Sequence, residues 1–368
     1  MVVSKAPVPA VNMPRWKLQT LVVGAKFKFL ENLKDMNMAK LHSAEQPCDT
    51  GSLRIAVLIP CYNEEIAVAQ VVADFRQALP QAAIHVFDNN SSDETVPRAL
   101  AAGALVSNVP FRGKGNVIRR MFADIDADIY VMADGDATYH APSANALIEK
   151  LIREQLDMVV GTRQHEMKEA YRSGHEFGNK LLTGCVVSIF GGTFTDMLSG
   201  YRVFSRRYVK SFPALAHGFE TETELTVHAL ELRMPYGEMV TPYGARLTGS
   251  TSKLSTYKDG VRILKTIVRL YATERPLMFY SLFSVLSILI SVILAVPLAM
   301  TYAKTGLVPR FPTAILSTGL FLVSATSFVA GLILEATTLS RREFKRLSYL
   351  AIPTTNSLAK SDSHRNFC

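Results

Sequence analysis

Short apolar runs alternate with polar loops and with segments of helical periodicity over much of the chain. Short, mainly apolar runs of this kind are typical of buried strands. They occupy residues 55–60, 83–87, 105–106, 129–133 and 158–161. Between the first two, apolar residues recur at helical spacing over residues 66–75. A second helix is expected from Asp93, as its N-cap, to Ala102, and a third after Arg112. Strands that alternate with helices predict a parallel, doubly wound α/β sheet.

The pattern changes after residue 254. Residues 255–276 mix apolar and basic positions, which predicts a helix lying on membrane headgroups; a helix packed over a site is the alternative. Two uncharged apolar runs follow over 277–303 and 311–334, each long enough to cross the hydrocarbon core. We expect a transmembrane hairpin spanning 277–335, although two buried helices of a soluble protein would show a similar pattern.

The basic residues around this hairpin predict its orientation. Nine lysines and arginines flank the two runs, whereas the connection contains only Lys304 and Arg310. The positive-inside rule then places the α/β domain and both termini in the cytoplasm, in a two-pass integral membrane protein. We expect a basic, possibly amphipathic segment at 1–52 and the α/β domain at 53–254. The interfacial helix and the hairpin follow, and a tail at 336–368, first basic and then polar, is expected to lack packed structure.

Composition narrows the class of partner. The formal net charge of +8 favours nucleic acid, an anionic membrane surface or a phosphorylated ligand. No zinc-finger or RNA-binding signature is present in the sequence, so we expect no nucleic acid partner. Hydrophobic residues make up 48% of the chain, which agrees with membrane segments. The four cysteines are scattered, which is typical of a reducing compartment.

The strongest chemical signal follows the strand at 129–133. Asp134 and Asp136 stand one residue apart where the strand ends, and ligands bind at that edge of an open α/β sheet. Two carboxylates this close favour a cation between them, so the pair predicts a site for Mg²⁺ or Mn²⁺ that also holds phosphates. The other strands are also followed by polar or glycine-rich loops, at 62–64, 88–90 and 112–115. Together these loops predict a nucleotide pocket, although each alone could be an ordinary turn.

These loops and several downstream motifs resemble family 2 glycosyltransferases of the GT-A fold. The motifs are Pro60-x-Tyr62-Asn63-Glu64, Asp88 to Asp93, Asp134-Gly135-Asp136, Gly161-Thr162-Arg163, Thr195-Asp196-x-x-Ser199-Gly200-Tyr201-Arg202, Gly218 to Glu224 and Gly249-x-x-Ser252-Lys253. Within that family they are most similar to the dolichyl- and polyprenyl-phosphate sugar transferases. Thr138 departs from the pattern, because dolichol-phosphate mannose synthases have a glutamine there, so the sugar is not assigned.

The resemblance implies roles for individual residues. The donor site would comprise Pro60, Tyr62, Glu64, Asp88, Lys114, Asp134 and Gly135, with Asp88 on the base and a metal ion on Asp134 and Asp136. The acceptor phosphate would contact Arg163, Arg202, Ser252 and Lys253. Asp136, Arg202 and Asp196 would be the catalytic residues. Both Lys114 and Asp196 also have interpretations without a role in the site: Lys114 could be a solvated loop lysine, and Asp196 could cap a helix or turn.

The function expected is therefore inverting, metal-dependent transfer of a sugar from a nucleotide diphosphate to a polyprenyl phosphate. An ionised phosphate can attack without a strong base, so no catalytic histidine is required. Two alternatives stay open: a transferase acting on a sugar hydroxyl, and a non-catalytic membrane scaffold that senses nucleotides. The resemblance is also compatible with a homo-oligomer assembled through the membrane helices.

Overall fold

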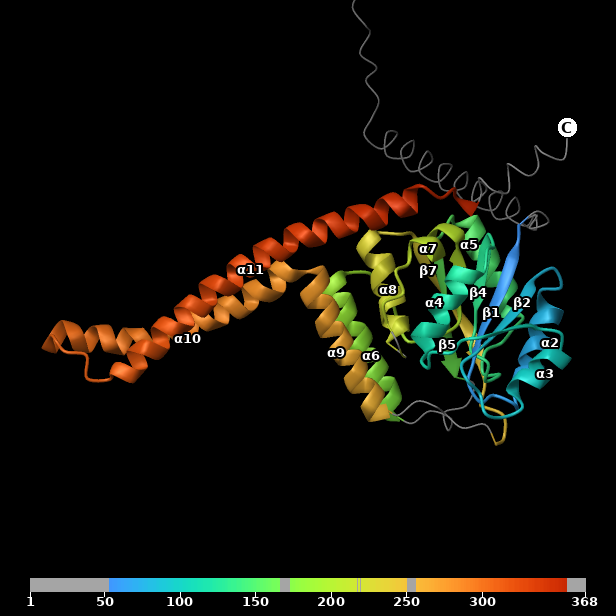
Figure 1. Cartoon of the computed structure of the whole chain (residues 1–368), viewed down its shortest axis with the longest axis horizontal. Coiled ribbons are helices and arrows are strands. Elements are labelled where there is room, and N and C mark those ends of the chain that lie inside the picture. The colour runs from blue at the N-terminus through green and yellow to red at the C-terminus, as the bar shows by residue number, and fades with distance from the viewer. Residues whose placement is uncertain (1–52, 166–172, 217, 219, 250–255, 356–368) are drawn as a thin grey trace, which may run out of the picture. The chain divides into compact units, whose positions relative to one another are not determined.

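The computed structural model describes residues 53–165, 173–216, 218, 220–249 and 256–355 (Figure 1). A seven-stranded sheet with the order β3-β2-β1-β4-β6-β5-β7 forms the centre of the domain. Its strands are β1 (Ile55–Cys61), β2 (Ala83–Asp88), β3 (Leu105–Asn108), β4 (Ile129–Met132), β5 (Met158–His165), β6 (Arg202–Ser205) and β7 (Tyr236–Tyr243). The α/β class expected from the sequence is confirmed.

The sheet is mostly parallel. β1 pairs in parallel with β2 and β4, and β5 pairs in parallel with β7. β6 is antiparallel to both of its neighbours, β4 and β5. The apolar pattern does not predict β6 or β7. β6 has only four residues, and the residues of β7 are mostly half-buried and lack a continuous apolar run.

Side chains of β1 alternate between two hydrophobic cores, one on each face of the sheet. Val57 and Ile59 belong to the core beneath α2 (Val68–Ala78) and α5 (Ser143–Arg153). Ala56 and Leu58 belong to the opposite core, which α4 (Lys114–Asp124) and α8 (Thr221–Leu232) cover. Because successive strand residues point to opposite faces, a continuous apolar run is needed to pack both layers.

Two short helices complete these layers. α3 (Thr95–Ala101) begins one residue later than expected, with Glu94 rather than Asp93 at its N-cap position. The Asp93 carboxylate instead accepts hydrogen bonds from the amide and hydroxyl of Thr95. α7 (Arg206–Ser211) follows β6 directly and is capped by the Ser205 side chain, which accepts from the amide of Tyr208.

A third apolar cluster joins α6 (Ser173–Phe190) to α9 (Thr256–Glu274), which lie side by side in Figure 1. α9 leads directly into α10 (Pro276–Thr305), which packs against α11 (Phe311–Leu350). Serine hydroxyls bridge this pair, Ser284 to Ser324 at 2.9 Å and Ser291 to the carbonyl of Ser317 at 2.8 Å. Both helices are long and apolar enough to cross a membrane.

α11 extends well beyond the apolar run that ends at residue 334, so its last turns occupy the start of the segment expected to be an unpacked tail. This part of the helix contacts the α/β domain. Lys345 pairs with Glu231 of α8 at 2.8 Å, and the Tyr349 hydroxyl donates to the buried carboxylate of Asp157 at 2.7 Å. Two basic residues of the segment expected to be an unpacked tail, Arg342 and Lys345, therefore form ion pairs with Glu231 of the domain.

Candidate active site

The site lies where the strand order reverses. β1 has β2 on one side and β4 on the other, and the carboxyl ends of these parallel strands meet at one edge. The loops after β1 and β4 touch there, because a Cβ on Gly135 would lie 2.5 Å from the sulfur of Cys61. Only glycine permits this approach, which brings the Asp134-Gly135-Asp136 turn beside the Pro60-to-Glu64 loop.

A cavity of about 450 Å³ opens at this edge. Eight residues predicted for the donor or acceptor sites line it: Pro60, Tyr62, Glu64, Lys114, Asp134, Gly135, Asp136 and Arg163. The same wall contains residues that the sequence analysis did not assign, among them Asn89, Arg112, Tyr139, Asn179, Tyr243 and Arg246. The structure thus brings the donor loops and Arg163 to one cavity.

Lys114 joins two acidic residues across this cavity. Its ammonium nitrogen lies 2.5 Å from Asp134 Oδ1 and 2.6 Å from Glu222 Oε1. Burial alone would lower the pKa of Lys114, but the charges of Asp134 and Glu222 outweigh it and raise that pKa. Lys114 is therefore a charged, nearly buried partner of Asp134 and Glu222, and the alternative of a solvated loop lysine is wrong.

Asp136 is held on both of its oxygens. Oδ1 accepts hydrogen bonds from the Thr138 hydroxyl at 2.6 Å and the Thr138 amide at 3.2 Å, and Oδ2 pairs with Arg246 at 2.6 Å. Burial, together with the neighbouring charge of Asp134, raises the pKa of Asp136. Arg246 and Thr138 offset that effect by stabilising the carboxylate.

The acidic pair fits a divalent cation that retains other oxygen ligands. A Cβ on Gly200 would lie 2.6 Å from Asp134 Oδ2, so glycine leaves room for this carboxylate. The described residues contain no cluster of three histidine, cysteine or acidic side chains arranged for a metal. Mg²⁺ is commonly bound through one or two carboxylates plus waters and substrate phosphates, and Asp134 with Asp136 supplies that donor set.

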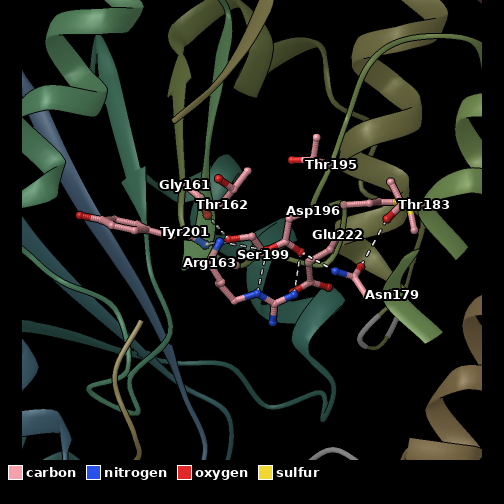
Figure 2. A network of polar contacts seen from close by, with 12 residues as sticks. Gly161, Thr162, Arg163, Asn179, Thr183, Thr195, Asp196, Ser199, Tyr201 and Glu222 are labelled. Atoms are coloured by element: carbon pink, nitrogen blue, oxygen red, sulfur yellow. Dashed lines mark hydrogen bonds and ion pairs between the residues drawn. The ribbon is translucent and has the colours of Figure 1, made fainter. Parts of the chain in front are cut away.

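Arg163 enters the cavity from the end of β5 and is fixed by Asp196. Two of its guanidinium nitrogens donate to the Asp196 carboxylate at 2.8 and 2.7 Å, and its amide donates at 3.2 Å (Figure 2). Asn179 of α6 donates to the same carboxylate at 2.9 Å. Burial would raise the pKa of Asp196, but these donors lower it. Asp196, predicted as a catalytic residue, does not line the cavity; it orients Arg163.

Arg202, predicted as a catalytic and phosphate-binding residue, lies in the interior. Its side chain is completely buried, and its guanidinium donates to the carbonyls of Ser199 and Met197 and to the Thr226 hydroxyl. Its position ties the segment before β6 to α8. The structure therefore does not bring Arg202 to the cavity.

Asp88 is buried beside the donor loops but is not part of the cavity wall. Oδ2 accepts from the amide of Ser91 at 3.1 Å, and Oδ1 has no hydrogen-bond partner within the described ranges. A buried carboxylate oxygen without a donor is costly, so a ligand N–H would be favourable there. Ser252 and Lys253, predicted for the acceptor phosphate, lie outside the described residues.

Two of the unassigned residues, Tyr243 and Arg246, share one reason for escaping prediction. They end or follow β7, a strand that the apolar pattern does not indicate. Its parallel pairing with β5 carries both residues to the edge of the sheet that holds Asp136. The only signal in the sequence was the position of Arg246 just before the Gly249 motif.

Comparison with known proteins places these observations in a family. A sequence model of "Glycosyl transferase family 2" matches residues 56–211. The glycosyltransferase AglJ of Haloferax volcanii is 33% identical over 228 residues, which are 61% of this chain and 75% of that protein. A dolichyl-phosphate hexose transferase of the same organism is 28% identical over 227 residues, 60% of this chain and 95% of that protein.

Among solved structures, the chain is similar to glucosyl-3-phosphoglycerate synthase from Mycobacterium tuberculosis, crystallised with Mn²⁺, UDP-glucose and phosphoglyceric acid. The TM-score is 0.52 at 22% identity, and the match covers 61% of this chain and 82% of that one. At this identity the likeness shows the fold alone, which is that of the GT-A glycosyltransferases.

Proposed function

The chain belongs to glycosyl transferase family 2, and we propose that it transfers a sugar from a nucleotide diphosphate to a polyprenyl phosphate at the cytoplasmic face of a membrane. The observation that carries this proposal is the cavity itself. The acidic pair Asp134 and Asp136 and the fixed arginine Arg163 line it together with Ile263 of α9, the helix that leads into α10.

The donor half of the cavity suits a nucleoside diphosphate. Asp134 and Asp136 would hold a divalent cation, which would act as a Lewis acid on the departing diphosphate. Lys114 adds a fixed positive charge beside it. The resemblance implies that Asp88 would contact the base, although its Oδ1 is buried outside the cavity wall. Tyr62, with Arg112 over its ring at 5.5 Å, would border the nucleoside.

The acceptor half suits a phosphate. Arg163 offers a guanidinium that is already oriented by Asp196, and arginine binds phosphate oxygens well because its planar fork matches them. Asp134 and Glu222 pair with Lys114, and Asp136 pairs with Arg246. These three carboxylates are thus engaged by cations rather than poised to remove a proton, which favours an acceptor that is already ionised over a sugar hydroxyl.

The position of α9 supports a lipid acceptor. Ile263 borders the cavity, and α10 begins 13 residues later, about 20 Å along a helix at 1.5 Å per residue. We propose that α9 is the interfacial helix of the 255–276 segment and that α10 and α11 are the membrane hairpin. A phosphate at headgroup level would then be within reach of the cavity while its polyprenyl chain stays in the bilayer. The related dolichyl-phosphate hexose transferase supports this choice of acceptor.

The test is a product analysis with the full chain in lipid nanodiscs or detergent. UDP- and GDP-sugars are supplied in turn with undecaprenyl phosphate or dolichyl phosphate and Mg²⁺ or Mn²⁺, and lipid extracts are analysed by mass spectrometry. We expect a polyprenyl-phosphate sugar with one donor and loss of product on chelation of the metal. Sugar transfer to a glycolipid hydroxyl, or no transfer with any donor, would contradict the proposal. Labelling of cysteines introduced at the connection 306–310 from outside intact cells tests the orientation.

A further inference from the structure

Thr138 lies two residues after the Asp134-Gly135-Asp136 turn, and its role is not accounted for by any part of the proposed function. Its side chain is almost completely buried, and both its hydroxyl and its amide donate to the same oxygen of Asp136. We propose that Thr138 is a positioning residue that fixes the Asp136 carboxylate so that only Oδ2 is offered to the cation. This inference rests on the proposed function, because it takes Asp136 to be a cation ligand.

The local backbone is built around this contact. Ala137 has φ of +57°, a left-handed conformation that costs a non-glycine residue roughly 1 kcal/mol. That conformation folds Thr138 back onto Asp136. The carbonyl of Thr138 accepts from the amide of Gly244 at 2.9 Å, and Tyr139 forms a bridge with Tyr243, so the turn is tied to the segment after β7.

The threonine hydroxyl is a well-defined donor in this setting. A β-branched side chain has few χ1 rotamers, and burial holds this one against Asp136. With Oδ1 occupied by two donors, the carboxylate cannot rotate without breaking both. Its other oxygen, Oδ2, pairs with Arg246 at 2.6 Å. A cation approaching Asp136 therefore meets Oδ2 and has to displace one guanidinium contact.

Loss of the hydroxyl would change that competition. The terminal torsion of aspartate is soft, and the Thr138 amide alone, at 3.2 Å, would hold Oδ1 less firmly, so the carboxylate would turn more readily and present both oxygens to Arg246. An arginine bound through two parallel hydrogen bonds is harder to displace than one bound through a single oxygen. Thr138→Val keeps the volume of the side chain and removes the donor, and we expect it to weaken cation binding by roughly tenfold, the effect of one hydrogen bond to a charged group.

Binding of Mn²⁺ by the full chain in detergent, without lipid acceptor, tests this directly. Free Mn²⁺ is titrated by electron paramagnetic resonance in the presence of UDP and, separately, GDP. Thr138→Val should raise the Kd for Mn²⁺ about tenfold, and Thr138→Ser should restore it. In an Arg246→Met background the valine substitution should have a smaller effect, because the competing guanidinium is absent. In turnover assays, Thr138→Val should raise the KM for Mn²⁺ more than it lowers kcat at saturating metal.

Thr241→Val is the matched control, since Thr241 is also buried and its hydroxyl donates to a backbone carbonyl, that of Thr162 at 3.3 Å, rather than to a carboxylate. If Thr138→Val does not fold, Thr138→Ala carries the same test. Wild-type affinity in folded Thr138→Val, with Mn²⁺ bound by the wild type, would overturn the inference alone. If the wild type bound Mn²⁺ neither with UDP nor with GDP, both the inference and the proposed cation site would be overturned. Failure of the lipid product assay alone would contradict the proposed acceptor and leave the Mn²⁺ binding result unaffected.

Discussion

Substitution of Glu274, at the end of α9, should change how stability depends on pH. Glu274 lies at the junction of α8, α9 and α11, with Glu231 beside it and Lys345 Nζ 3.5 Å from its carboxylate. Burial, the hydrogen bond to Glu231 and the charge of Glu231 together raise the pKa of Glu274 to about 7, while Lys345 and Arg341 oppose the shift. The folded protein therefore binds this proton more tightly than the unfolded chain.

The raised pKa of Glu274 links proton binding to the free energy of unfolding. An acid with a raised pKa favours the folded state when protonated, so its contribution to stability falls as pH rises from the unfolded value of 4.5 towards 7. The full contribution of Glu274 to the free energy of unfolding, present at low pH, is about 3 kcal/mol, and about 2 kcal/mol of it is lost between pH 5.5 and pH 8. Glu274→Gln mimics the protonated acid, because its amide can donate to Glu231. We expect the variant to be more stable than the wild type at pH 8.

Thermal unfolding in detergent at pH 5.5 and pH 8, at one scan rate, measures the effect. The fall in Tm between the two pH values should be smaller in Glu274→Gln by about 4 °C. His228, whose pKa burial lowers to about 3, acts in the opposite direction but contributes equally to both proteins. Glu343→Gln, an exposed residue of α11, is the control and should keep the wild-type dependence. The same dependence in Glu274→Gln would refute the reasoning.

Three further substitutions test other contacts. Asp136→Asn should lower formation of the lipid-linked sugar by about 100-fold, since the cation would lose about 3 kcal/mol of transition-state stabilisation; a wild-type rate would show that Asp136 holds no essential cation. Asp196→Asn leaves the guanidinium of Arg163, whose side chain is 15% exposed, without its countercharge, so stability should fall by about 3 kcal/mol in denaturant unfolding, and an unchanged midpoint would refute the pairing. Tyr349→Phe removes a hydrogen bond to the Asp157 carboxylate worth about 1.5–3 kcal/mol, so hydrogen exchange at the end of α11 should accelerate, whereas unchanged protection would contradict docking of this helix.

Much of the donor side could be predicted from the sequence because its residues follow strands directly. Asp134 and Asp136 come after β4, and Tyr62 and Glu64 come after β1, so the parallel pairing of those strands is enough to bring them together. Local pattern also predicted a helix after Arg112, and α4 begins at Lys114. For such residues, the position along the chain nearly determines the position in space.

The acceptor side and the support of the site were harder to predict. Arg163 and Arg202 both belong to motifs of the resemblance, yet one lines the cavity and the other is buried among backbone carbonyls. Adjacent segments of β5 and β6 face different surroundings because β6 runs antiparallel between β4 and β5. A sequence motif specifies the residue type but not the direction in which its strand pairs with the neighbouring strands, and that direction decides where the side chain lies.

The sequence by itself determined the α/β class, the two apolar helices and the carboxylate pair after β4, since each depends on neighbouring residues and on burial of apolar side chains. The tertiary structure decided which charges meet: Lys114 with Glu222, Asp136 with Arg246, and Lys345 with Glu231. Each of these pairs joins residues about a hundred positions apart. Their proximity depends on strand order and on the return of α11 to the domain, and no local pattern of hydrophobic and polar residues encodes either.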